Sequence, residues 1–361
     1  MKTKFFLLAC FFCSVGLMAQ NMNNVRIVGF TRDNSRKFIH VPNLMGYKTL
    51  KCDFHMHTVF SDGVVWPTVR VDEAWQEGLD VIAITDHIEN NPSKKFVGGD
   101  DNSSFDIAKP HADKKGILLI KGAEITRKMA PGHFNALFIT NTNELDTPNY
   151  MDAFEAAKKQ GAFIIWNHPG WKAQQPDTCK WWDAHTELLS KGMLHAVEVF
   201  NEQEYYPIAF DWCDEKGIAY TAASDIHGLI QNQYDLNKQH RPMTLVLATE
   251  NSESALKEAL FARRTIAWFG QYLAGKEEFL REFFMASVKC NLMSENTKEK
   301  VYRVSNISDV PFLLKSADGV SVKIAAYSES MVEIPLTSNG TFEVTNLFIR
   351  SKKNLSAKFP F

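Results

Sequence analysis

The sequence predicts an α/β domain, folded as a barrel or an open wound sheet, followed by a small all-β domain. Short apolar runs alternate with helix-like segments from Lys51 to about Arg264, which is typical of parallel strands covered by helices. Beyond about residue 275 the apolar runs are short and are separated by turn residues, which is typical of a β-sandwich. A length of 361 residues agrees with about two domains.

Eight apolar runs of the first domain have the length and composition of buried strands. They are Lys51–His55, Asp80–Thr85, Ile117–Lys121, Phe134–Thr140, Ala162–Asn167, His195–Phe200, Ile218–Ser224 and Met243–Ala248. Helix-like segments lie between most of them: Pro67–Glu77, Tyr150–Gln160, Trp181–Lys191, Tyr205–Lys216 and Ser252–Phe261. The stretch from Ile88 to Gly116 is long and polar, and we interpret it as an insertion that forms a lid or a surface loop.

The second domain is predicted from six short strand-like runs. They are Phe284–Asn291, Lys300–Asn306, Phe312–Lys315, Val320–Ala326, Met331–Pro335 and Gly340–Leu347. The last histidine of the chain is His240, so we interpret this domain as a module that packs on the barrel or on a partner, not as a second catalytic site. The predicted domains are residues 51–275 and 276–361, after a lead-in segment at residues 20–50.

The first residues have the pattern of a secretory signal peptide. A basic start, Met1 to Lys4, precedes an apolar run from Phe5 to Met18, and Ala19 is a small residue suited to cleavage. We therefore expect residues 1–19 to be removed and the protein to be exported to the periplasm or the extracellular space. The apolar run is shorter than the ~20 residues that span a bilayer. Cys10 and Cys13 stand in poor contexts for lipid attachment, which disfavours an anchor.

Composition excludes several classes of function. Hydrophobic residues make up 45% and charged residues 23%, as in folded soluble proteins. The formal net charge of −2 provides no broad cationic field, which disfavours general nucleic-acid binding. The cysteines beyond the predicted signal peptide show no CxxC spacing, so neither a zinc knuckle nor a redox pair is indicated.

Imidazole and carboxylate side chains recur where the predicted strands end. His55 and His57 close the first strand, and their neutral imidazoles are good ligands for zinc, iron or manganese. Further residues of this kind at strand ends are Asp86, His87, Glu124, His168, Glu198, Asp225 and His227. Barrels of alternating strands and helices form their sites at the carboxyl ends of strands, so we expect these side chains to converge. His133 precedes its strand and therefore sits at the opposite end from the pattern.

These residues occur in motifs that resemble the polymerase and histidinol phosphatase (PHP) superfamily of metal-dependent phosphoesterases. The motifs are His55-Met56-His57 with Ser61-Asp62-Gly63, Thr85-Asp86-His87, Glu124, Gly132-His133, Asn167-His168-Pro169 and Ser224-Asp225-Ile226-His227. They cover about residues 51–230 in the family's order. The resemblance implies a distorted seven-stranded (β/α)7 barrel and a site for two or three divalent ions, zinc, manganese or iron.

The resemblance also implies a role for each motif residue. His55, His57, Glu124 and Asp225 would bind a first metal, and Glu124 would bridge to a second held also by His133 and His168. Asp62, His87 and His227 would hold a third, where some relatives place a histidine instead of Asp62. Glu198 matches no ligand position, and we expect Glu198 and Asp86 to orient ligands or loops from behind.

The expected activity is hydrolysis of a small-molecule phosphoester, with weak preference for phosphodiesters over phosphomonoesters. A metal-held water loses a proton near neutral pH, and the resulting hydroxide attacks phosphorus. We assign Asp225 to proton transfer to the leaving group and Arg127 to the phosphate oxygens, which suit its fork-shaped guanidinium. Two alternatives remain open: a metal-dependent amidase or lactonase, and a non-catalytic, metal-stabilised binding protein.

Overall fold

The computed structural model describes residues 35–360. The predicted signal peptide, residues 1–19, lies outside the described residues, as does the lead-in segment up to residue 34. From Arg36 onward the described chain forms one compact unit. In the region from residue 35 to 360, no helix combines the length and the apolar character that crossing a bilayer requires.

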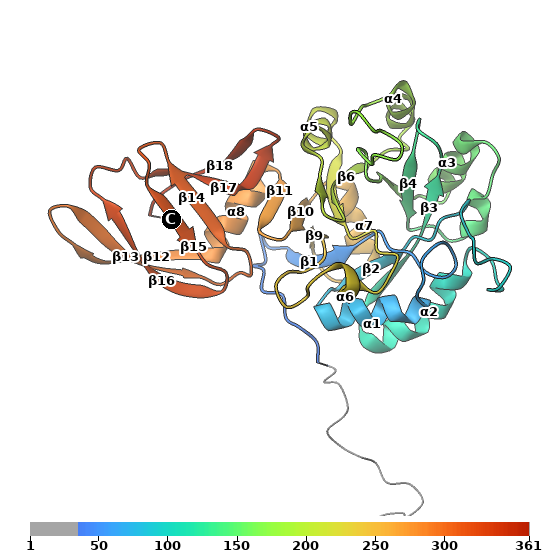
Figure 1. Cartoon of the computed structure of the whole chain (residues 1–361), viewed down its shortest axis with the longest axis horizontal. Helices are drawn as coiled ribbons and strands as arrows, with labels where there is room; N and C mark the ends of the chain where they lie inside the picture. The colour runs from blue at the N-terminus through green and yellow to red at the C-terminus, as the bar shows by residue number, and fades with distance from the viewer. Residues whose placement is uncertain (1–34, 361) are drawn as a thin grey trace, which may run out of the picture. The chain divides into compact units, whose positions relative to one another are not determined.

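The first part of the chain alternates strands and helices, as the sequence predicts (Figure 1). Its strands are β1 (Lys48–Asp53), β2 (Val81–Ile84), β3 (Leu118–Thr126), β4 (His133–Leu137), β5 (Phe163–Trp166), β6 (Ala196–Asn201), β7 (Glu204–Tyr205), β8 (Ala219–Ala223), β9 (Met243–Ala248), β10 (Thr265–Phe269) and β11 (Tyr272–Gly275). Its helices are α1 (Pro67–Glu77), α2 (Ser103–Lys115), η1 (Thr142–Leu145), α3 (Tyr150–Lys159), α4 (Asp183–Ser190), α5 (Pro207–Lys216), α6 (Ile230–Gln233) and α7 (Glu253–Phe261).

Seven strands of this part, including β1, form a mixed sheet. They follow the order β1, β2, β3, β4, β5, β6, β8. No continuous ladder closes this part of the described chain into a barrel. Instead, the segments beyond β1 and β8 meet in one parallel bridge between Met56 and Ile226. Beside it, the Thr244 hydroxyl joins β9 to β8 by accepting from Ala222 N–H at 3.0 Å and donating to Ala222 O at 2.9 Å.

The strands are not all parallel, and this changes where one candidate residue lies. β4 pairs antiparallel with both β3 and β5, and β9 pairs antiparallel with β1. His133 is the first residue of β4 and lies across the ladder from Thr126, the last residue of β3. The amino end of β4 therefore meets the carboxyl ends of its neighbours, and His133 is on the same edge as the other candidates, not opposite to them.

Local sequence explains the helix α1 and its ends. Pro67 occupies its first turn, where a missing N–H costs nothing, and Gly78 ends it in the left-handed conformation at φ 89°. The backbone N–H of Leu79 then bonds to Ala74 O at 3.0 Å, which turns the chain into β2. The buried face of α1 carries apolar Val71 and Ala74 beside three charged side chains, Arg70, Glu73 and Glu77.

The interpretation of residues 88–116 as a lid or loop is only partly correct. Ser103–Lys115 forms the helix α2, with Ala108 and Ala112 buried. Pro110 inside this segment and the polar composition conceal its weak apolar face from the sequence pattern. The helix α2 lies beside α1 on the outside of the sheet (Figure 1). Only the part before it, residues 88–102, remains a loop.

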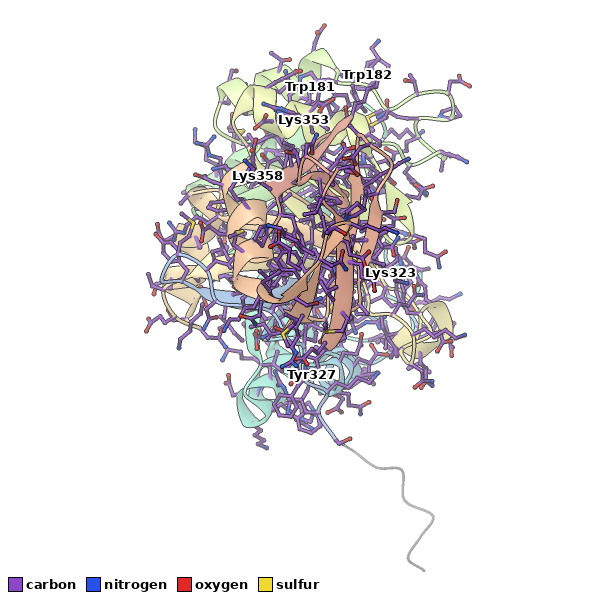
Figure 2. All side chains as sticks on the ribbon, turned by 90° about the vertical axis from the view of Figure 1, so that its left-hand side faces the viewer. Trp181, Trp182, Lys323, Tyr327, Lys353 and Lys358 are labelled. Atoms are coloured by element: carbon purple, nitrogen blue, oxygen red, sulfur yellow. The ribbon has the colours of Figure 1, made fainter. Side chains whose placement is uncertain are left out.

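The C-terminal part begins with the helix α8 (Glu277–Ser287), which the sequence interpretation missed. Phe284 of this helix packs edge-on against Phe312, with the ring centroids 4.9 Å apart. Seven strands follow in two sheets: β12 (Val288–Glu295), β13 (Glu299–Asn306), β14 (Phe312–Ser316), β15 (Ser321–Ile324), β16 (Ser328–Pro335), β17 (Thr341–Arg350) and β18 (Lys353–Lys358). Side chains alternate along β18 as expected for a sandwich: Leu355 and Ala357 are buried, whereas Ser356 and Lys358 are exposed (Figure 2 labels Lys358). The predicted all-β module is confirmed.

Two strands connect the α/β part and the all-β part. β11 pairs in parallel with β17, with Leu273 opposite Leu347. The ring of Phe348 on β17 stacks on Tyr205 of β7 at 5.2 Å and on Tyr272 of β11 at 5.6 Å. The Ser351 hydroxyl and N–H both bond to the Asp211 carboxylate on α5.

Candidate metal centre

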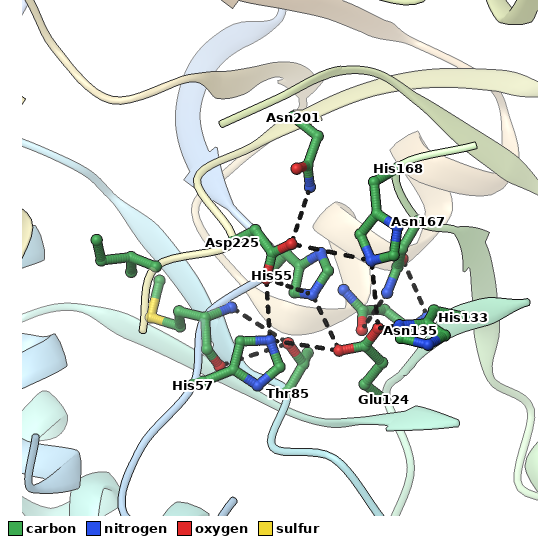
Figure 3. Close-up of polar contacts among 12 residues, drawn as sticks. His55, His57, Thr85, Glu124, His133, Asn135, Asn167, His168, Asn201 and Asp225 are labelled. Atoms are coloured by element: carbon green, nitrogen blue, oxygen red, sulfur yellow. Dashed lines mark hydrogen bonds and ion pairs between the residues drawn. The ribbon is translucent and has the colours of Figure 1, made fainter. Parts of the chain in front are cut away.

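Nine side chains gather at one edge of the strands, and they are the nine that the sequence singles out as ligands. Their ligand atoms form four overlapping groups in which all atoms lie within 4.8 Å of one another. The groups are His55 with Glu124 and His168; His55 with His57 and Asp225; His87 with Glu124 and His133; and His57 with Asp62, His87 and His227. Figure 3 shows most of this cluster and the contacts within it.

Glu124 is the centre of the cluster. Its carboxylate is fully buried, and one oxygen, Oε2, lies 3.1 Å from His55 Nε2, 3.3 Å from His57 Nε2 and 3.1 Å from His87 Nδ1. The other oxygen, Oε1, lies 3.0 Å from His133 Nδ1 and 3.7 Å from His168 Nε2. A carboxylate that faces five imidazoles with both oxygens has the geometry of a bridging ligand.

Asp225 closes the cluster from the end of β8. Its Oδ1 lies 3.1 Å from both His55 Nε2 and His57 Nε2. Asp225 has φ 50° and His168 has φ 27°, and neither is a glycine. Residues held in this sparsely populated region often occur at functional sites. Here the turns aim both side chains back toward Glu124.

Asp62 holds the outer part of the cluster. Its Oδ1 lies 3.2 Å from His227 Nε2, and its Oδ2 lies 3.5 Å from His87 Nε2. Asn90 donates to Asp62 Oδ2 at 2.9 Å. The side chains of Asp62 and His227 are 29% and 37% exposed, whereas those of His55 and His57 are fully buried, so this end of the cluster opens to solvent.

Glu198 supports the ligands from behind, in agreement with the role expected for it. Its Oε1 lies 2.8 Å from His55 Nδ1, and its Oε2 accepts from the His168 backbone N–H at 2.8 Å. Asn201 donates to the same Oε2 at 2.8 Å (Figure 3 shows this residue). Asp86 plays the second expected role, because it accepts from Thr58 N–H at 2.6 Å and from the Ser61 hydroxyl at 2.7 Å and so fixes the loop after His57.

Two buried arginines hold the ligand loops together, and sequence reasoning missed both. Arg70 is fully buried and donates to three carbonyl oxygens, those of His57, Ile226 and Gly228, at 2.8, 3.0 and 2.7 Å. Arg241 donates to Asp53 at 3.1 Å and pairs with Glu77. Asp53 in turn accepts from the Ser224 hydroxyl at 2.6 Å, next to Asp225. Charged residues on a helix or in a loop normally face solvent, so only their burial identifies them.

The carboxylates and imidazoles shift one another's pKa values. Burial alone lowers the pKa of His57, but Asp225 and Glu124 outweigh it and raise that pKa to about 9. The pKa values of His55 and His168 are raised for the same reason, against the opposing effect of burial. Burial alone raises the pKa values of Glu124 and Asp225, whereas the surrounding imidazoles hold both well below the usual range. Both carboxylates are therefore ionised at neutral pH.

The donor set fits divalent metal ions. Among the described residues, three of the buried polar atoms that lack a hydrogen-bond partner belong to this cluster: Asp62 Oδ1, Glu124 Oε1 and His133 Nδ1. Glu124 Oε1 and His133 Nδ1 are only 3.0 Å apart, yet the two are not aligned as a hydrogen bond. Buried polar atoms normally have hydrogen-bond partners. A cation bound between Glu124 Oε1 and His133 Nδ1 would explain why neither atom has one. Imidazole and carboxylate ligands suit zinc, manganese and iron.

A cavity of about 800 Å³ opens from this cluster. Six of the nine side chains line it: Asp62, His87, His133, His168, Asp225 and His227. Lys172 is the only lysine or arginine in its lining. Arg127 is not in that lining, because its guanidinium pairs with Glu89 at 2.8 Å and donates to Thr147 O at 2.6 Å. The structure does not bring Arg127 to the ligands, and a role in phosphate binding stays a prediction.

A mixed α/β sheet with an imidazole and carboxylate cluster at its strand ends defines a metal-dependent hydrolase. The PHP domain model matches residues 53–237, and an Ig-like domain model matches residues 287–360. The chain belongs to the PHP family of metal-dependent phosphoesterases.

Two known proteins illustrate the relationship. A solved two-domain protein from Bacteroides vulgatus, described as containing a predicted PHP-like metal-dependent phosphoesterase, is 47% identical, with a TM-score of 0.88 over 91% of this chain and 99% of that chain. A 5'-3' exoribonuclease from Haemophilus influenzae is 37% identical over 78 residues, 22% of this chain and 24% of that protein. This chain therefore spans about a quarter of the length of the curated relative that it matches.

Proposed function

We propose that this protein hydrolyses phosphoesters with divalent ions held by the nine-residue cluster. The arrangement of Glu124, whose two oxygens face five imidazoles, carries the proposal. Ions bound there would neutralise the phosphoryl oxygens and lower the pKa of a water molecule. His55, His57 and Glu124 form the fully buried part of the site, and Asp62 and His227 its partly exposed part.

The protein's own groups would position and neutralise the substrate. Lys172 lines the cavity and is placed to pair with a phosphate oxygen. Asp225 also lines the cavity, and its ionised Oδ2 would take a proton from the attacking water and pass one to the leaving oxygen. Asn201 donates to Glu198 and lies 3.5 Å from Asp225 Oδ2, which keeps that oxygen oriented.

Chromogenic substrates test the reaction class. Purified protein with Mn²⁺ or Zn²⁺ is expected to cleave p-nitrophenyl phosphate or bis(p-nitrophenyl) phosphate, and the sequence favours the diester. Glu124→Gln should lose both metal and activity, whereas Glu155→Gln, at an exposed position on α3, should keep both. Inactivity on both esters, with metal bound as measured by elemental analysis, would contradict the proposal. Turnover of only an amide or a lactone would favour the amidase or lactonase alternative. Ligand binding without any turnover would favour the non-catalytic binding protein.

Export is a separate proposal, since it rests on residues 1–19 alone. We propose that the chain is processed after Ala19 and acts in the periplasm or outside the cell. N-terminal sequencing of the protein purified from its host should begin at Gln20. A start at Met1 in the cytosolic fraction would contradict export.

We also propose that the Ig-like module supports the cavity wall. Phe348 stacks on Tyr205, the neighbour of cavity-lining Glu204 and Tyr206. Loss of this ring in Phe348→Ala should raise KM while the bound metal remains unchanged. The same KM as the unmodified protein would argue instead that the module serves a partner.

A further inference from the structure

We infer that the cavity selects a phosphoester whose leaving group carries no further phosphate and is rich in hydroxyl groups, such as a sugar or a polyol. This inference rests on the proposed function and narrows its substrate class. The residues that carry it line the cavity but are not among the nine candidate ligands. They are Trp171, Lys172, Glu202, Gln203, Glu204 and Gln233.

The charge of this wall opposes a polyanionic substrate. Beyond the candidate ligands, the cavity presents one ammonium group, Lys172, against two carboxylates, Glu202 and Glu204. Proteins that follow a nucleic-acid strand line the groove with several Lys or Arg side chains, because every phosphate needs a counter-charge. Arg127, the nearest candidate from the sequence, is occupied by Glu89 and by Thr147 O. The cavity therefore suits one phosphate at the ligand cluster and no second one.

Trp171 provides a flat apolar surface next to the ligands. Its ring centroid lies 5.6 Å from that of His133 and 5.3 Å from that of His168, and 43% of the residue is exposed. An exposed indole beside two candidate ligands will contact the leaving group of any ester whose phosphate reaches the cluster. The C–H face of a sugar ring packs well on such a surface, while its hydroxyls point outward to polar groups.

Polar groups of the right kind lie on the same cavity. Glu202 has φ 47° at the turn between β6 and β7, a conformation that costs energy for a residue other than glycine. Glu202 and Gln233 both line the cavity, so its wall offers a carboxylate acceptor and an amide donor. Glu204 accepts from the Tyr206 hydroxyl at 2.5 Å and is already engaged. The carboxylate can accept from one hydroxyl of a substrate, and the amide can donate to another.

A small amine-bearing leaving group fits less well, because an ammonium offers no acceptor to the Gln233 amide and ethanolamine has no ring to pack on Trp171. In the proposed reaction the bond from phosphorus to the sugar oxygen breaks and a bond from phosphorus to the water oxygen forms. One proton of that water ends on the sugar oxygen. For a phosphomonoester the products are inorganic phosphate and the free sugar or polyol; for a diester the second product is the remaining phosphomonoester.

The test compares kcat/KM for several esters with the full chain loaded with Mn²⁺. The probes are glucose 1-phosphate, glucose 6-phosphate and glycerol 2-phosphate, against phosphoethanolamine, a 5'-phosphorylated thymidine dinucleotide, which carries a second phosphate, and p-nitrophenyl phosphate. At least one hydroxylated monoester should exceed phosphoethanolamine and the dinucleotide by about tenfold or more, since unmet hydrogen bonds in a polar wall are costly.

Substitutions in the cavity wall test which residues determine the preference for hydroxylated esters. Glu202→Gln should lower kcat/KM for the preferred hydroxylated ester about tenfold, and for p-nitrophenyl phosphate by less than about threefold, because the nitrophenyl ring has no hydroxyl for this carboxylate. Trp171→Ala should lower kcat/KM for both esters, because the indole contacts the leaving group of either. Glu155→Gln and Trp182→Phe, outside the cavity lining, are the matched controls and should change neither. Equal losses on all esters in Glu202→Gln, or preference for the dinucleotide or for phosphoethanolamine, would overturn the inference. If the protein hydrolyses p-nitrophenyl phosphate but none of the hydroxylated esters, this inference is overturned and the proposed function stands. If it hydrolyses none of the esters although metal is bound, the result counts against the proposed function.

Discussion

Glu198 Oε1 lies 2.8 Å from His55 Nδ1, and this contact decides which nitrogen His55 offers to the site. With Nδ1 engaged by a carboxylate, Nε2 faces Glu124 and Asp225, each with an oxygen at 3.1 Å. A carboxylate behind a ligating histidine fixes the tautomer and raises the basicity of the ring.

Glu198→Gln is therefore expected to weaken metal binding about 10- to 100-fold, because the amide no longer favours the ligating tautomer. Competition with a fluorescent chelator measures this affinity. Glu187→Gln, at an exposed position on α4, is the control and should bind metal like the unmodified protein. An unchanged affinity in Glu198→Gln would assign Glu198 to folding alone.

Arg70 joins two loops that carry ligands, so its loss should destabilise the fold as well as the site. Arg70→Met leaves Glu73 buried without its partner and three carbonyls without a donor, and we expect the free energy of unfolding to fall by about 3–5 kcal/mol. Urea denaturation in the presence of a chelator measures this. The control, Arg281→Met, removes an exposed arginine paired with Glu277 and should cost less than about 1 kcal/mol. Equal effects of both substitutions would contradict the account.

Metal binding should release protons at neutral pH. In the metal-free protein the pKa of His57 is raised to about 9, and those of His55 and His168 are raised as well, so these rings carry protons that a metal must displace. Metal affinity should therefore fall as the pH drops from about 9. Calorimetric titration with Mn²⁺ in buffers of different ionisation enthalpy counts the protons. No proton release at pH 7 would show that the rings are neutral before binding.

Acid should weaken the fold through three histidines away from the cluster, of which His185 is buried and His195 and His240 are half-buried. Burial lowers the pKa of His195 to about 4, and likewise those of His185 and His240. The unfolded chain, with pKa values near 6.5, takes up these protons first, so stability is complete above about pH 6.5 and is lost as the pH falls toward 4.

His195→Asn should reduce this pH dependence. His195 Nδ1 accepts from Ile164 N–H at 3.0 Å, and an asparagine oxygen can replace that acceptor without titrating. Between pH 7 and pH 5 the variant should lose about 2 kcal/mol less unfolding free energy than the unmodified protein. Urea denaturation at the two pH values measures the difference. Parallel loss in both proteins would mean that His195 does not contribute.

Arg127 and Lys172 can be separated by substitution. Arg127 contacts Glu89 and Thr147 O. Arg127→Ala should therefore lower the unfolding free energy by about 1–3 kcal/mol and leave KM nearly unchanged. Lys172→Ala should do the reverse, raising KM about tenfold with little effect on stability. If Arg127→Ala instead raises KM and keeps its stability, the phosphate-binding role that the sequence suggests for Arg127 is supported.

Much of the fold and the ligand set could be predicted because both depend on local pattern. Buried strands such as Phe163–Trp166 appear as continuous apolar runs, and their ends mark where side chains leave the sheet. The helix α2 was not predicted because its buried face holds only small residues, which makes the helical periodicity of apolar residues weak. The helix α8 was not predicted because a phenylalanine-rich segment of that length is compatible with a strand or a helix.

The periodicity and identity of neighbouring residues were enough to predict most strands and helices in their order and the chemical kind of the candidate ligands. The strand pattern placed His133 at the wrong end, although the family resemblance included it among the ligands. The tertiary structure explains its place in the cluster, because β4 runs antiparallel to β3. It also decided that Arg70 and Glu198 face inward and that Arg127 faces away from the cavity. A charged side chain looks the same in a sequence whether water or a buried partner surrounds it, and only packing selects between the two.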